Sequence, residues 1–279
     1  MNFQNPHRPQ PTSLISLAKS VVIHRQLIWQ MIKREVIGRY KGSVFGLAWS
    51  FLNPILMLTI YTFVFSVVFK ARWGGDGSDS KTQFALLVFV GMIILGLFTE
   101  AFNRAPSLIL GNANYVKKVV FPLEILPIIS LGAALFHAAI SFLVLTMAIL
   151  VINHHLYWGF VFVPLIFAPL VFFTLGITWM LASLGVYMRD VGQPIGILTT
   201  VLMFMSPVFY PVSALPPKFQ SIMMLNPLTF IIEQSREVLI LGRTPDWGGL
   251  GAYTLISLLV MWIGYAWFQK TRKGFADVL

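Results

Sequence analysis

Basic residues gather just before the first long apolar run, where they could bind a phosphate group. No Asp, Glu, Lys or Arg occurs from residue 42 to 69, so Lys41 stands at the edge of that run. Arginine can hold phosphate oxygens through two parallel hydrogen bonds, whereas lysine acts as a point charge. We therefore predict a lipid head-group site with Arg39 as its first ligand; alternatively, these cations only fix topology and contact anionic lipid. The candidate ligands are Arg25, Lys33, Arg34, Arg39 and Lys41.

A second charged cluster lies in an otherwise apolar segment near the C-terminus. Glu233, Arg236 and Glu237 are spaced i, i+3 and i+4, which places them on one face of a helix. Ionised groups near membrane depth cost a few kcal/mol each unless they are paired. We expect these side chains either to pair with one another or to face a wet cavity. The alternative is an exposed surface outside the membrane.

Two groups of aromatic residues could stack on the apolar faces of sugar rings. Aromatic residues at i, i+4 and i+8 share one face of the first apolar run, and three more end a later run. The alternative is a belt at the membrane interface combined with ordinary packing. The residues are Tyr61, Phe65 and Phe69 in the first group and Phe204, Phe209 and Tyr210 in the second.

The sequence offers no chemistry of its own for catalysis. It contains no G-x-x-x-x-G-K-[ST] phosphate loop, no cysteine and no His cluster with metal-ligand spacing. We therefore predict a chain that is not an enzyme and holds no metal or cofactor. If ATP drives this protein, another chain hydrolyses it. The net charge of +10 is interpreted as membrane topology rather than nucleic-acid binding.

The composition indicates an integral membrane protein that must position these residues on helices. Hydrophobic residues make up 57% of the chain, charged residues 11%, and the mean hydropathy is +0.79. We predict an all-α polytopic fold with six transmembrane helices, and a kink at Pro54 in the first. The polar break Asn153-His154-His155 divides the longest uncharged run into two spans. The expected spans are about 44–69, 83–103, 123–152, 158–187, 192–212 and 248–268.

The remaining segments surround this transmembrane domain of residues 44–268. Residues 1–43 form a basic arm, in which 13–34 are predicted to be an amphipathic helix lying in the interface plane. Docking of that helix on a soluble partner is the alternative. Residues 269–279 form a tail. Fourteen Lys and Arg residues lie on the side of the termini and six lie opposite, which predicts that both termini are cytoplasmic.

Two connections are too structured for plain loops. The first, 104–122, is basic and ends at Pro122, on the side predicted to be cytoplasmic. The second, 206–246, is rich in proline and contains an apolar helix at 228–241 that ends before Gly242. Fourteen helical residues reach only ~21 Å, too little to cross a bilayer. We expect re-entrant helices lining a cavity, because irregular backbone at membrane depth needs protein or water around it.

Five stretches, in order along the chain, resemble the permeases of ABC-type polysaccharide and polyol-phosphate exporters. These permeases are the membrane subunits that export O-antigen, capsule or teichoic-acid chains. The stretches are Arg39–Pro54, Asn112–Glu124, Arg189-Asp190, Ser206–Pro211 and the segment from Asn226-Pro227 to Glu237.

The resemblance implies a subunit of the bacterial inner membrane that moves lipid-linked polysaccharide, most simply O-antigen, out of the cytoplasm. Two copies would form the channel, and two copies of a separate ATPase, which binds ATP and Mg, would dock beneath. The substrate would be carried on an undecaprenyl-type lipid pyrophosphate. Residues 206–246, with Glu233, Arg236 and Glu237, would form the periplasmic gate. The residues implied to contact the ATPase are Asn112, Asn114, Tyr115, Lys117, Lys118 and Phe121.

Other functions remain open at this point. Capsule or teichoic-acid export, or export of a small molecule or lipid, would use the same architecture. An ion-coupled transporter needs ionisable groups within its spans, and the sequence offers only His137 and Glu100. A membrane-embedded transferase needs acidic catalytic residues near the interface, and the acidic residues here are scattered.

Overall fold

The computed structural model describes residues 11–68, 81–117 and 121–279, and over these ranges the chain forms helices and no strand. Phe69 and Lys118, both singled out above, lie outside the described residues. Five helical stretches are long and apolar enough to cross a membrane, which confirms an all-helical, multi-span protein. They are Gly46–Phe65, Gln83–Ser107, Ile125–Asn153, Trp158–Tyr187 and Trp247–Val278.

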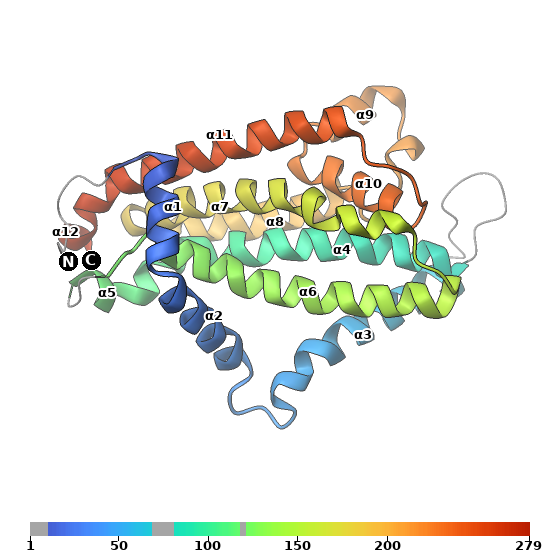
Figure 1. Ribbon diagram of the computed structural model, residues 1–279, viewed down its shortest axis with the longest axis horizontal. Coiled ribbons are helices and arrows are strands. Elements are labelled where there is room, and N and C mark those ends of the chain that lie inside the picture. The colour runs from blue at the N-terminus through green and yellow to red at the C-terminus, as the bar shows by residue number, and fades with distance from the viewer. Residues whose placement is uncertain (1–10, 69–80, 118–120) are drawn as a thin grey trace.

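The long helices lie side by side, and the first and last described helices are at the same end of the bundle (Figure 1). The main helices after the first span are α4 (Lys81–Arg104), α6 (Ile125–Asn153), α7 (Val163–Tyr187) and α11 (Trp247–Thr271). The predicted break between the third and fourth spans is present, because α6 ends where His154 adopts a left-handed conformation with φ of 59°. The tail is also helical, with α12 at Phe275–Val278.

The predicted helix at 13–34 is wrong in one respect, since the structure has two helices there. Helix α1 (Leu14–Ile23) begins at the Ser13 cap, and α2 (Arg25–Tyr40) follows after a break at His24. The His24 Nδ1 atom lies 2.9 Å from the backbone oxygen of Ser20, so the side chain competes for a carbonyl of the preceding turn.

The predicted fifth span at 192–212 is shorter in the structure. Helix α8 covers Gly192–Met205, and the chain then becomes extended at Ser206. Pro207 and Pro211 follow, and prolines disfavour helical backbone both at their own position and at the residue before. Fourteen residues of helix reach ~21 Å, so α8 alone falls short of a full crossing.

Helices α7 and α11 pack with their backbones almost in contact. A Cβ atom on Gly264 would overlap the backbone oxygen of Gly176, and one on Gly176 would lie 2.6 Å from the oxygen of Val260. Small residues permit such close approach, and dispersion contacts between helices replace the hydrophobic drive that lipid cannot supply.

Helices α2 and α3 (Trp49–Tyr61) form a V that projects from the other side of the bundle (Figure 1). Pro54 lies inside α3, and the residues Thr62–Val68 continue it in wider π-helical turns. Much of α3 is apolar and exposed, including Ile55, Leu56 and Ile60. In a bilayer this surface meets lipid or another protein.

Candidate functional site

A charged groove lies between α2 and α4 at the end of the bundle where α1 and α12 are found. One guanidinium nitrogen of Arg39 lies 2.5 Å from Glu100 Oε1, and His137 Nδ1 on α6 lies 2.9 Å from the same oxygen. Arg104 at the end of α4 pairs with Glu35 on α2 at 2.6 Å. Two ion pairs therefore tie α2 to α4. The groove has a volume of about 680 Å³ and is lined by Glu35, Gly38, Arg39, Gly96, Thr99, Glu100, Asn103 and Arg104.

This arrangement corrects an expectation from residue spacing. Glu100 and Arg104 are four residues apart and would be expected to pair with one another along α4. Instead each is paired with a residue of α2, because that helix brings an opposite charge to each of them. Glu35 was not predicted, although it is the one acid among the first 43 residues, and that isolation was a usable signal. Burial raises the pKa of the Glu35 carboxyl, and Arg104 opposes the shift.

The five candidate head-group ligands are all exposed, but the structure places them in two groups. Arg39 already faces Glu100, and Arg34 donates to the Tyr115 hydroxyl at 3.1 Å. Lys33 and Lys41 have no carboxylate partner among the described residues. Arg25, at the start of α2, donates to the backbone oxygen of Val22 on α1 at 3.2 Å. The head-group assignment remains a prediction; within the described part of the chain only Arg39 of the five forms an ion pair, and Lys33 and Lys41 have no side-chain hydrogen-bond partner.

The connection predicted to dock on an ATPase folds into short helices under the same end of the bundle. Helix α5 (Ala113–Lys117) contains Asn114, Tyr115 and Lys117, with Asn114 and Lys117 exposed, and Asn112 ends the short turn before it. The Tyr115 ring stacks on the buried Phe121 with centroids 4.4 Å apart. The exposed polar residues are therefore presented on a segment held by an aromatic pair.

A buried ion pair that sequence reasoning missed fixes the end of this connection. Arg272 in the tail, one of the fourteen Lys and Arg residues counted above for topology, lies 2.7 Å from Glu124 and is almost fully buried. Ser20 of α1 donates to the other carboxylate oxygen of Glu124 at 2.9 Å. Trp179 Nε1 donates to the Glu124 backbone oxygen at 3.0 Å. The start of α6 thus joins α1, α7 and the tail.

At the opposite end, Arg236 on α10 (Pro227–Leu239) is 1% exposed and holds three segments together. Its guanidinium donates to the backbone oxygens of Leu87 at 3.0 Å, Pro207 at 2.5 Å and Val208 at 2.8 Å. Glu233 lies 3.1 Å away. Burial lowers the pKa of Arg236 to about 10, so it stays charged at pH 7, and burial raises the pKa of Glu233.

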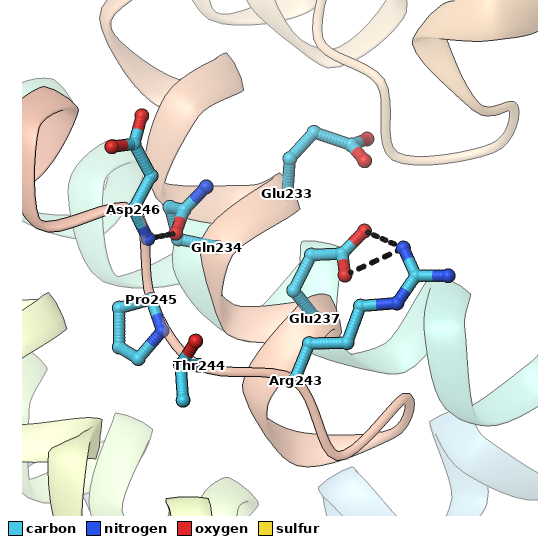
Figure 2. Close-up of a pocket in the computed structure, with 7 residues that line it drawn as sticks. All are labelled: Glu233, Gln234, Glu237, Arg243, Thr244, Pro245 and Asp246. Atoms are coloured by element: carbon cyan, nitrogen blue, oxygen red, sulfur yellow. Dashed lines mark hydrogen bonds and ion pairs between the residues drawn. The ribbon is translucent and has the colours of Figure 1, made fainter.

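Glu237 pairs outside this cluster. Figure 2 shows its carboxylate facing Arg243, with the closest oxygen at 3.1 Å, while Glu233 lies on the neighbouring turn of α10. All three residues line a surface pocket of about 590 Å³. The other lining residues are Gln234, Thr244, Pro245 and Asp246. Of the expected cluster, the Glu233–Arg236 pair is present, whereas the partner of Glu237 comes from the linker after α10.

The aromatic candidates fall into two contacts. Phe65, after α3, stacks on Phe209 with centroids 5.8 Å apart, which joins the first span to the segment after α8. The Tyr210 hydroxyl donates to the backbone oxygen of Phe204 at 2.8 Å, and the Phe204 ring is exposed. Tyr61 is half-buried. Whether any of them meets a sugar remains a prediction.

The five long apolar helices define a multi-pass membrane protein. Residues 26–240 match the ABC-2 type transporter family, and the chain belongs to it.

Several curated proteins are similar over nearly their whole length. The chain is 27% identical to the O-antigen export system permease protein RfbA of Myxococcus xanthus, over 95% of this chain and 99% of that protein. It is 26% identical to the O-antigen export system permease protein RfbA of Klebsiella pneumoniae, over 91% of this chain and 95% of that protein. It is 21% identical to the polysialic acid transport protein KpsM of Escherichia coli, over 90% of this chain and 96% of that protein.

Proposed function

We propose that this chain is the channel-forming subunit of an ABC exporter that moves lipid-linked polysaccharide, with O-antigen as the first candidate. The observation that carries the proposal is the similarity to O-antigen export permeases, which extends over 95% of the chain. Capsule export is the second candidate, because the capsule export protein CtrC of Neisseria meningitidis is also similar over 93% of the chain. The proposed location is the bacterial inner membrane, with both termini in the cytoplasm.

In this proposal α8 and the residues after it complete a sixth crossing, and 206–246 form a re-entrant gate on the periplasmic side. The supporting observation is that α10 is short and that Arg236 ties it to Leu87 on α4 and to the residues after α8. A buried charge held in this way keeps irregular backbone packed against protein, as the membrane requires.

The channel would form between two copies of the chain. Helix α8 exposes Ile197, Val201 and Phe204, and α3 exposes Ile55 and Ile60. These surfaces suit contacts with lipid or with a second copy, and two copies would enclose the aromatic residues of the first span. ATP and Mg would be bound by two copies of a separate ATPase docked below the connection that contains α5.

Removing the charges of Lys33 and Lys41 is expected to reduce export about tenfold, because a pyrophosphate would lose two cationic ligands. The double variant is Lys33→Gln with Lys41→Gln. Polymer display at the cell surface measures the effect. The matched control, Lys270→Gln with Lys273→Gln, removes the same charge from the same proposed side. Equal losses in the two variants would favour a topology role alone.

Reversing the charge of the α5 end is expected to separate ATP hydrolysis from export. In Lys117→Glu with Lys118→Glu, hydrolysis by the complex should continue while export falls at least tenfold, because the docking surface changes sign. Phosphate release and polymer display are measured together. Lys218→Glu, on α9 (Pro217–Met223) at the other end of the bundle, is the control. Normal export by the double variant would remove this segment from the ATPase interface.

The proposed function is tested by depleting the chain in its own cells. Lipid-linked polymer should accumulate in the cytoplasmic leaflet while surface polymer disappears, and the wild-type chain should restore display. Normal surface polymer without the chain would refute the proposal.

A further inference from the structure

The groove between α2 and α4 differs in character from the exposed lysines Lys33 and Lys41. Its walls are successive turns of two helices, because Glu35, Gly38 and Arg39 share one face of α2. Gly96, Thr99, Glu100, Asn103 and Arg104 form the opposing wall on α4. It lies at the end of α4 that leads toward α5, and of the proposed head-group ligands Arg39 lines it.

The charges of this groove are already balanced. Its two arginines, Arg39 and Arg104, are paired with its two carboxylates, Glu100 and Glu35. A pyrophosphate entering the groove would meet both carboxylates and would have to displace them from their partners. Binding of a pyrophosphate to the exposed Lys33 and Lys41, which lie outside the groove, would displace neither of these carboxylates.

The same walls offer hydrogen-bond donors and acceptors side by side. The guanidinium groups can only donate, the carboxylates can only accept, and the Thr99 hydroxyl can do both. Asn103 accepts from Thr199 of α8 at 2.7 Å through its side-chain oxygen, which leaves its amide nitrogen to donate. A sugar hydroxyl is both a donor and an acceptor, so an uncharged polyol matches this surface.

The groove also has the room that a sugar ring needs. Its volume of about 680 Å³ lies in the ~300–1,000 Å³ range of small-molecule sites. At Gly38 and at Gly96 an added Cβ atom would meet nothing within 4 Å. Both glycines therefore face open space, and they let a ligand approach the helix backbones closely.

We propose that this groove binds the uncharged sugar residues next to the lipid pyrophosphate, while Lys33 and Lys41 bind the pyrophosphate itself. The inference rests on the proposed function. It assigns Arg39, Glu100, Thr99 and Asn103 to recognition of the glycan rather than of the phosphate. A lipid that carries the pyrophosphate without sugar would use the lysines and leave the groove empty.

The test compares two probes on the permease–ATPase complex in nanodiscs: undecaprenyl pyrophosphate, and the same lipid bearing a neutral disaccharide. Wild type should bind the glycosylated lipid about tenfold more tightly. Gly96→Leu, which fills the groove, should remove that difference and leave the affinity for the sugar-free lipid unchanged. The matched control Gly251→Leu, on α11 where a Cβ also meets nothing within 4 Å, should retain the difference.

Each of the other outcomes counts against the inference, and one of them also counts against the proposed function. Equal affinity of wild type for the two probes, or an equal loss of both in Gly96→Leu, would overturn the inference while the head-group site stands. Binding of neither probe by wild type would refute the proposed function, and the inference with it. Asn103→Ala should also reduce the difference in affinity between the two probes, and it adds no bulk. The test therefore still decides if Gly96→Leu fails to fold.

Discussion

Arg236→Met should leave little folded permease in the membrane. The change removes the donors to three backbone oxygens, those of Leu87, Pro207 and Val208, and leaves Glu233 half-buried without its counter-charge. Unsatisfied buried groups cost about 1–3 kcal/mol each, and breaking a buried ion pair costs about 3–5 kcal/mol. The loss is therefore of the same order as the whole free energy of unfolding of many proteins.

The measurement is the yield of monodisperse protein after extraction and its thermal midpoint. Arg243→Met is the matched control, because the Arg243 side chain is 70% exposed and its pair with Glu237 contributes at most about 1 kcal/mol. Arg236→Lys should give an intermediate result, since one ammonium cannot reach all three oxygens in the fork geometry. An Arg236→Met protein as stable as Arg243→Met would show that these oxygens find other partners.

Gly264→Leu is expected to separate α7 from α11 and to prevent assembly of the bundle. Even a Cβ at this position overlaps the backbone of Gly176, and a backbone cannot move aside as a flexible side chain can. Overpacking costs about 1–3 kcal/mol and occasionally more, and here it also removes the helix contact itself.

Gly251→Leu on the same helix is the control, because its Cβ meets open space. The thermal midpoint of Gly264→Ala should lie between those of Gly264→Leu and Gly251→Leu, since it adds only one carbon. If Gly264→Leu extracts and melts like Gly251→Leu, the close approach of α7 and α11 is not required for the fold.

The helical, multi-span class could be predicted from the sequence because apolar runs of bilayer length have few alternatives. Local signals also succeeded. The short helix predicted at 228–241 is present as α10, and Gly242, predicted to follow its end, has a positive φ of 67°.

Most of what failed depended on contacts between residues far apart in sequence. Glu100 lies 61 residues from Arg39, and no spacing rule ranks that partner above the local Arg104. The oxygens bound by Arg236 are up to 149 residues away, so only its pairing with Glu233 was visible in the sequence. The end of α8 was misjudged because the sequence stays apolar past Met205, whereas the helical conformation of the backbone ends there.

Two neighbouring residues of α2 contact different parts of the connection 104–122. Arg34 donates to Tyr115 on α5, and Glu35 pairs with Arg104, where α4 gives way to that connection. In the proposed exporter, the groove and the ATPase surface therefore act on one helix. Thermodynamic linkage then requires reciprocity: if docking of the ATPase alters the affinity for the lipid by some factor, the lipid alters ATPase docking by the same factor. Either affinity, measured with and without the other partner, yields a single coupling free energy for the whole complex.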